Sequence, residues 1–99
     1  MKPSIFHPGA ASEYAEAAEY YTAIELELGG RFYDEIEGLI NEVCRHPKRF
    51  RIFESDTRRH FSDVFPYAVI YLEESDRIWI VAVMHMHREP GYWRSRLKS

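Results

Sequence analysis

The chain has 99 residues, of which 45% are hydrophobic and 29% are charged, and its formal net charge is −3. These values are typical of a globular protein with one modest core, so we predict a single domain over residues 1–99. The sequence has no run of about 18 apolar residues and no basic-then-apolar leader, so we expect no membrane association. A single cysteine, Cys44, excludes an internal disulfide framework and favours a cytoplasmic protein.

The two parts of the chain differ in charge. Residues 1–43 contain nine acidic and two basic residues, whereas residues 44–99 contain seven acidic and eleven basic residues. Such an asymmetry indicates two faces that meet different partners. It is equally compatible with the tendency of solvent-facing helices to carry glutamate.

A short strand and an amphipathic helix are predicted first. The strand covers residues 4–6, and Pro8 suits the first helical position, where its missing N–H is not needed. Apolar residues recur at three- and four-residue spacing on one face of the helix: Tyr14, Ala17, Ala18, Tyr21, Ile24 and Leu28. The outward positions carry Glu13, Glu16 and Glu19. We expect the helix to end at Gly29-Gly30, because glycine readily adopts the positive φ of a helix C-terminus.

A second helix follows after a very short link. Its apolar face consists of Phe32, Ile36, Leu39, Ile40 and Val43. The helix is expected to stop before Pro47, because the residue preceding a proline is pushed out of the α region. The short link predicts that the two helices pack as an antiparallel hairpin.

The second half of the chain has the pattern of a β-sheet. Residues 48–56 are interpreted as a loop, and strands are predicted over residues 57–62, 66–73 and 77–87, with a possible short helix over residues 90–98. A tight polar turn at residues 74–76 joins the last two strands as a hairpin. Both faces of that hairpin are apolar, so the face away from the helices must be covered by a partner or remain exposed. The predicted class is α+β, in the order β-α-α-β-β-β, with the helical hairpin on a small, mainly antiparallel twisted sheet.

Cationic and aromatic side chains gather after the last strand. They are His85, His87, Arg88, Tyr92, Trp93, Arg94 and Arg96. At the rim of a sheet these groups suit contact with an anionic or planar partner, although Trp93 is better explained as an anchor for a C-terminal helix. Strict alternation would place His85 and His87 on one strand face with Val81 and Val83. One His-x-His pair without a third ligand at usable spacing is weak support for a metal site, so we expect no metal and no cofactor.

Several short motifs occur along the chain in a characteristic order. They are Pro8 with Glu19-Tyr20-Tyr21, Gly29-Gly30-Arg31-Phe32, His46-Pro47, Arg58-Arg59, Phe65-Pro66-Tyr67 with Ile70-Tyr71, and Ala82-Val83 through Trp93. In this order, and in a chain of this length, the sequence resembles the RelE/ParE superfamily of toxins from type II toxin–antitoxin modules, also described as plasmid-stabilisation proteins. The resemblance covers nearly the whole chain.

The resemblance implies a growth-inhibiting toxin that is neutralised by a cognate antitoxin. That antitoxin would cover the sheet and part of the helical hairpin, and it would be the component that contacts operator DNA. RelE-like members of the superfamily cleave mRNA, usually in the ribosomal A site. ParE-like members inhibit DNA gyrase and have no known nuclease chemistry.

The residues for RelE-like catalysis are present only in part. Metal-independent RNA cleavage needs a proton donor and acceptor and a cation for the phosphate, roles that suit His85, His87, Arg88 and Tyr92. Arg88 matches an arginine that RelE-like nucleases place beyond the last strand, and Tyr92 lies near their functional tyrosine at a shorter spacing. A further arginine of those nucleases is replaced here by Ala68. The acidity of the chain also disfavours a ribosome-dependent enzyme.

We therefore expect a ParE-like toxin that acts by binding and inhibiting a target such as DNA gyrase, and not by catalysis. The predicted target-binding residues are Arg58, Arg59, Arg88, Tyr92, Arg94 and Arg96. Two alternatives stay open. One is a RelE-like mRNA endoribonuclease, and the other is a decayed, non-toxic interaction module with the same fold.

Overall fold

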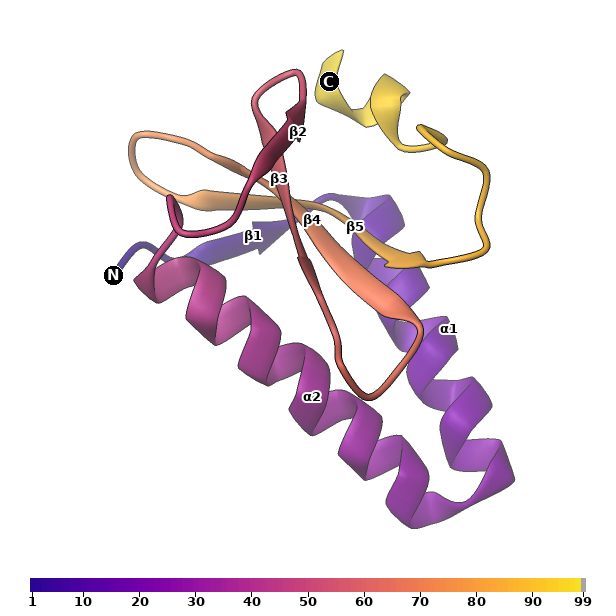
Figure 1. Cartoon of the computed structure of the whole chain (residues 1–99). Coiled ribbons are helices and arrows are strands. Elements are labelled where there is room, and N and C mark those ends of the chain that lie inside the picture. The colour runs from indigo at the N-terminus through magenta and orange to yellow at the C-terminus, as the bar shows by residue number, and fades with distance from the viewer. Residues whose placement is uncertain (99) are drawn as a thin grey trace.

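In the computed structural model, which describes residues 1–98, two α-helices pack on one face of a five-stranded sheet (Figure 1). The elements are β1 (Ser4–Phe6), α1 (Pro8–Ile24), α2 (Leu26–Arg45), β2 (Ile52–Glu54), β3 (Thr57–Phe61), β4 (Tyr67–Glu73), β5 (Ile78–His85) and the short 3-10 helix η1 (Arg94–Lys98). The strand order is β1-β5-β4-β3-β2, with β1 parallel to β5 and the other neighbours antiparallel. The predicted α+β class and mainly antiparallel sheet are confirmed.

The break between the helices lies at Glu25, so the predicted end at Gly29-Gly30 is wrong. Glu25 is extended, with φ −161° and ψ 133°, and α2 begins at the next residue. Gly29 is buried inside α2, and a Cβ at this position would lie 1.9 Å from Oγ1 of Thr22 on α1. The glycine therefore permits the close approach of two helices, a role that the local sequence pattern does not distinguish from helix termination.

The main core lies between the helices and the sheet, and its composition follows the predicted apolar faces. Every residue of the predicted α2 face is buried in it, together with alternate residues of β4 and β5: Val69, Tyr71, Ile78, Ile80 and Val83. The hydroxyl of the fully buried Tyr71 donates a hydrogen bond to the Pro47 carbonyl (2.6 Å), which connects the end of α2 to the sheet.

A second core lies on the opposite face of the sheet and is covered by the chain itself. The C-terminal segment, residues 86–98, crosses this face and inserts Trp93, which is 1% exposed and packs among Ala68, Ile70, Val81, Ala82 and Met84. This confirms the predicted anchoring role of Trp93. The ring of Phe53 contacts that of Trp93 (centroids 5.6 Å apart), so β2 belongs to this layer. The prediction of a loop over residues 48–56 missed β2, because a three-residue strand is too short to show alternation.

A β-bulge in β5 changes which residues share a face. Ile70 pairs with Ala82 whereas Tyr71 pairs with Ile80, so Val81 is an extra residue. Val81 packs in the second core, while Val83 packs in the main core. The predicted common face for Val81 and Val83 is therefore wrong, because strict alternation does not allow for a bulge.

Candidate target-binding surface

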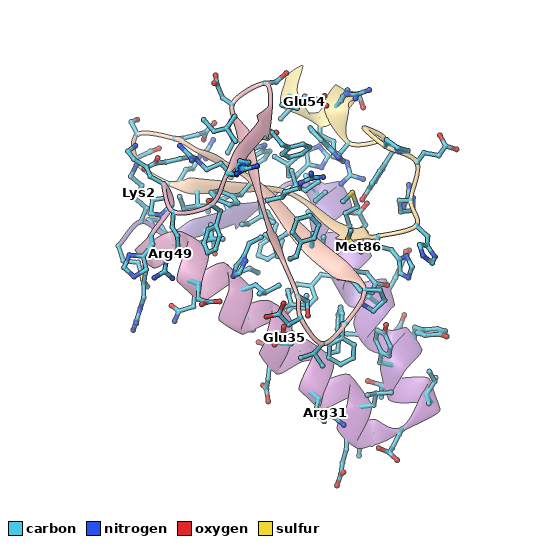
Figure 2. The ribbon with its side chains drawn as sticks, viewed as in Figure 1. Lys2, Arg31, Glu35, Arg49, Glu54 and Met86 are labelled. Carbon is cyan, nitrogen blue, oxygen red and sulfur yellow. The ribbon has the colours of Figure 1, made fainter. Side chains whose placement is uncertain are left out.

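Three arginines meet on the face of the sheet that carries the C-terminal segment. Arg59 comes from β3, Arg88 from the loop after β5, and Arg94 from the start of η1. They line a cavity of about 280 Å³, here called the arginine pocket, whose other walls are Phe53, Glu54, Met84, Met86, Pro90, Gly91 and Trp93. Figure 2 shows Glu54 beside the C-terminal segment and Met86 at the end of β5, on two sides of this region.

Arg59 is held by aromatic rings and not by a carboxylate. Its guanidinium carbon lies 4.2 Å from the ring centroid of Phe53 and 5.0 Å from that of Phe61. Among residues 1–98, no carboxylate lies within ion-pair distance of Arg59. A guanidinium placed against aromatic rings keeps its N–H donors free for an anionic group of a partner.

Arg94 is paired with the single acidic residue of the pocket. Its Nη2 donates a hydrogen bond to Oε1 of Glu54 (3.0 Å), and its Nε donates a second to Oε2. This pairing lowers the pKa of the Glu54 carboxyl and raises the pKa of the Arg94 guanidinium. Gly91 makes room for it: its φ is +74°, and a Cβ there would lie 2.3 Å from the guanidinium carbon of Arg94.

Arg88 and Arg96 flank the partly buried ring of Tyr92. The guanidinium carbon of Arg88 lies 3.8 Å from the ring centroid, and that of Arg96 lies 5.2 Å from it. The side chain of Arg88 is 51% exposed, whereas that of Arg96 is 16% exposed. The hydroxyl of Tyr92 is buried, and this burial raises its pKa. Arg88 is thus presented to solvent, while Tyr92 supports it from below.

Glu13 of α1 holds the C-terminal segment on the body of the domain. Its carboxylate accepts two hydrogen bonds from Arg96, at 3.1 and 2.9 Å, and one from the backbone N–H of Val83 at 3.1 Å. Arg96 also donates to the carbonyl of Val81 (3.0 Å). β1 pairs with β5 only as far as Ile80, so these two side chains satisfy backbone groups that a longer strand would otherwise bond.

Glu13 is the residue of this region that the sequence did not reveal. Helical spacing predicted it to point outward with Glu16 and Glu19, yet its side chain is only 14% exposed. The prediction failed because the partners of Glu13 lie 70 and 83 residues away in the chain. An arginine at position 96 and a glutamate in the first helix carry no local signal of their contact.

Arg58, which was predicted to bind the target together with Arg59, lies away from the arginine pocket. Arg58 lies on the helix side of β3, where its guanidinium donates to the carbonyls of Phe50 (2.7 Å) and Lys48 (3.3 Å). It is therefore separated from Arg59, because adjacent residues of a strand point to opposite faces. The structure brings together Arg59, Arg88 and Arg94, with Tyr92 behind Arg88.

His85 lies on the opposite side of the sheet from the arginine pocket, and the ring of His87 contacts that of His85 from beyond the end of β5. The ring of His85 contacts that of Tyr67 (centroids 5.0 Å apart), and His85 Nδ1 accepts a hydrogen bond from the backbone N–H of His87 (3.0 Å). His85 lines a separate cavity of about 320 Å³ between α1 and the ends of β4 and β5. Arg88 is the one described residue that lines both cavities.

Neither a metal site nor a membrane span is formed by the part of the chain that the structure describes. No three His, Cys, Asp or Glu side chains within residues 1–98 are grouped as metal ligands. Neither of the two described helices is long and apolar enough to cross a bilayer.

Comparisons with known proteins agree with this architecture. The structure is similar to a solved structure described as the chromosomal ParDE toxin–antitoxin system from P. aeruginosa, with a TM-score of 0.65 and 12% sequence identity over 88% of this chain and 98% of that chain. At this identity the likeness shows the fold alone. A search of curated proteins gave no match. A family model for the ParE toxin of the type II toxin–antitoxin system parDE matches residues 5–90, and the chain therefore belongs to the ParE family of type II toxins.

Proposed function

We propose that this ParE-family toxin inhibits its target by binding it through the arginine pocket, and that the target is DNA gyrase. The observation that carries the proposal is the convergence of Arg59, Arg88 and Arg94 on one cavity whose lining includes a single acidic residue, Glu54. Aromatic residues, methionine and arginine are enriched at protein–protein interfaces, and this surface combines all three.

Binding is favoured over RNA cleavage by the arrangement of the groups that a nuclease would need. The hydroxyl of Tyr92 is buried, so it does not face a ligand in the pocket. His85 lines a different cavity from Arg59 and Arg94. Arg88 borders both cavities, so only one of the three arginines lies beside His85, and the other two line the cavity on the opposite face of the sheet. General acid–base catalysis requires the proton acceptor and the phosphate-binding cations around one reacting group.

The partners and location follow from the same proposal. The family belongs to toxin–antitoxin systems, so the chain has an antitoxin as partner. We propose that operator DNA is contacted only through that antitoxin, because α1 and α2 present an acidic surface that duplex DNA repels. The proposed place of action is the cytoplasm, where the target would be found.

The test compares gyrase supercoiling by purified enzyme in the presence of the toxin and its variants. Replacing Arg59 and Arg88 by Gln removes two charge-assisted contacts, and we expect inhibition to weaken about 100-fold. Arg49→Gln is the matched control, since this exposed arginine lies in the α2–β2 loop, away from the arginine pocket (Figure 2). Unchanged inhibition by the double variant would refute the proposed surface.

Two further measurements separate the alternative functions. In the first, the toxin is incubated with RNA, with and without ribosomes. RNA cleavage by wild type that is lost in both His85→Ala and Arg88→Ala would establish the nuclease alternative. Inducible expression of the chain alone in a bacterial host tests toxicity directly. Normal growth at high soluble expression would show that the chain is a non-toxic interaction module.

A further inference from the structure

The three arginines of the arginine pocket differ in what their guanidinium groups already bind. Those of Arg59 and Arg88 donate no hydrogen bond within the part of the chain that the structure describes. Arg59 lies over the ring of Phe53 instead, and Arg88 lies over the ring of Tyr92. The carboxylate of Glu13 is 3.9 Å from Arg88, which is longer than a hydrogen bond. Both guanidinium groups therefore keep their N–H donors for a partner.

The third guanidinium, that of Arg94, is occupied by Glu54, and Glu54 is fixed by the turn that follows it. Ser55 and Asp56 form this turn between β2 and β3, with φ of 47° and 65°. Positive φ at both central residues is characteristic of the tight type I′ turns of hairpins. The hydroxyl of Thr57 also donates a hydrogen bond to the carbonyl of Glu54. The carboxylate of Glu54 is thus a fixed part of the pocket wall, and both of its oxygens accept hydrogen bonds from Arg94.

The pocket combines the two available guanidinium groups with an apolar lining. That lining consists of Phe53, Met84, Met86, Pro90 and Trp93. A carboxylate matches the planar fork of a guanidinium, and the Glu54–Arg94 pair shows this geometry inside the pocket itself. The cavity of about 280 Å³ is at the lower end of the range for ligand pockets. It suits an acidic side chain with an apolar neighbour from a protein segment.

A nucleic acid strand matches the same groups poorly. Its affinity depends on the number of phosphates that are neutralised, and only two guanidinium groups of the pocket are available. Phosphates on either side of a bound one would approach the carboxylate of Glu54. They would also approach Glu13 and Glu16 in the second cavity that Arg88 borders. Contacts between like charges cost affinity, so the surroundings of the pocket disfavour a polyanion.

We propose that Arg59 and Arg88 clamp a side-chain carboxylate of the target protein. The Glu54–Arg94 pair makes this clamp selective for the carboxylate over the phosphates of nucleic acid. Arg94 is a positioning residue, because it neutralises Glu54 and keeps that carboxylate from occupying the clamp. This inference rests on the proposed function in taking the arginine pocket as the target-binding surface, and it holds whether or not the target is gyrase.

The test uses small probes and needs no gyrase. They are a capped peptide of alternating leucine and aspartate, the same peptide with asparagine in place of aspartate, and a short single-stranded oligouridylate. Each is titrated into ¹⁵N-labelled toxin at about 0.15 M salt, and the side-chain Nε–Hε resonances of Arg59 and Arg88 are followed by NMR. For wild type we expect the aspartate peptide to bind about tenfold more tightly than either other probe. Equal or tighter binding of the oligouridylate would overturn the inference, and so would the absence of a shift at both arginines.

Glu54→Gln tests the selectivity. The loss of the carboxylate frees Arg94 for a phosphate, so the oligouridylate should bind about tenfold more tightly, and the slope of log affinity against log salt should steepen by about 0.7. Binding of the aspartate peptide should change by less than about threefold. Glu89→Gln is the matched control, because it makes the same change of charge at an exposed residue that adjoins Arg88 but does not line the pocket. Equal effects of the two variants would contradict a specific role for Glu54.

Arg94→Gln distinguishes positioning from direct contact. The unpaired carboxylate of Glu54 would then compete for Arg59 and Arg88, so the aspartate peptide should bind about tenfold more weakly. Addition of Glu54→Gln should restore peptide binding to within about threefold of wild type. If the double variant stays weak while its NMR spectrum is that of a folded domain, Arg94 contacts the ligand directly and the positioning role is refuted.

Gyrase inhibition separates failure of this inference from failure of the proposed function. If wild type does not inhibit gyrase, the proposed target is wrong, while the NMR titrations still decide between carboxylate and phosphate. If Arg59→Gln with Arg88→Gln loses inhibition but the wild-type pocket prefers oligouridylate to the aspartate peptide, the proposed function stands and the inference fails.

Discussion

Glu13 is expected to contribute about 3 kcal/mol to the stability of the domain, because it binds both a buried backbone N–H and a largely buried guanidinium. Its carboxylate accepts hydrogen bonds from the Val83 backbone and from the guanidinium of Arg96. Leaving a buried N–H without an acceptor costs about 1–3 kcal/mol. Loss of the Arg96 pair adds about 1–2 kcal/mol, which is below the value for fully buried pairs because both side chains retain some exposure.

The assay is urea unfolding at pH 7 followed by circular dichroism, for Glu13→Ala, Glu13→Gln and Glu16→Ala. A loss of about 3 kcal/mol corresponds to a fall in Tm of about 15 °C for a domain of this size. Glu13→Gln keeps an acceptor oxygen for the Val83 N–H but loses the charge, so we expect about half of that loss. Glu16→Ala is the control and should change stability by less than about 0.5 kcal/mol, because it alters an exposed side chain.

A double-mutant cycle with Arg96→Ala measures the ion pair separately. The coupling energy between Glu13 and Arg96 should be about 1–2 kcal/mol, since the two side chains are in direct contact. Stability of Glu13→Ala within about 0.5 kcal/mol of wild type would refute the argument that this side chain replaces a missing strand at the edge of β5.

Three further predictions follow from the packing and the charges. Gly29→Ala should destabilise by about 2 kcal/mol in urea unfolding, because its Cβ overlaps Thr22, whereas Gly30→Ala, with no atom within 4 Å, should be neutral or stabilising. Trp93→Ala should release the C-terminal segment, so limited proteolysis would cut after residue 86 in the variant and not in wild type. Lys48 and Lys2 lower the pKa of Glu73 below its ordinary 4.5. The ion pairs of Glu73 therefore stabilise the fold above pH 4.5, and this stabilisation is lost as the pH falls through the pKa of Glu73 in the folded state. The stability of Glu73→Gln should therefore approach that of wild type in acid.

The sequence was sufficient to predict the buried faces of those elements in which apolar residues recur at a regular spacing. The three- and four-residue spacing of Phe32, Ile36 and Leu39 predicted the buried face of α2, and all three are at most 5% exposed. The alternation in β4 likewise placed Val69 and Tyr71 in one core and Ala68 and Ile70 in the other. Such patterns are reliable because burial of one face requires apolar residues at the period of the element itself.

The composition of the arginine pocket could be predicted only in part. The concentration of cationic and aromatic residues after β5 included Arg88 and Arg94, which line this pocket. It did not show that Arg59 joins Arg88 and Arg94 while Arg58 turns to the helix side of the sheet. Nor did it show that Arg96 is bound to Glu13. Residue type indicates which chemistry is available, whereas the set that meets in space depends on strand register.

What the sequence alone determined is therefore the fold class, the two apolar helix faces and the family resemblance that the family model confirms for residues 5–90. The tertiary structure decided the bulge at Val81, the helix break at Glu25 and the closure of the second sheet face by Trp93. The physical reason is that these features depend on contacts between distant parts of the chain, such as the 83 residues between Glu13 and Arg96. Local periodicity carries no information about contacts of that range.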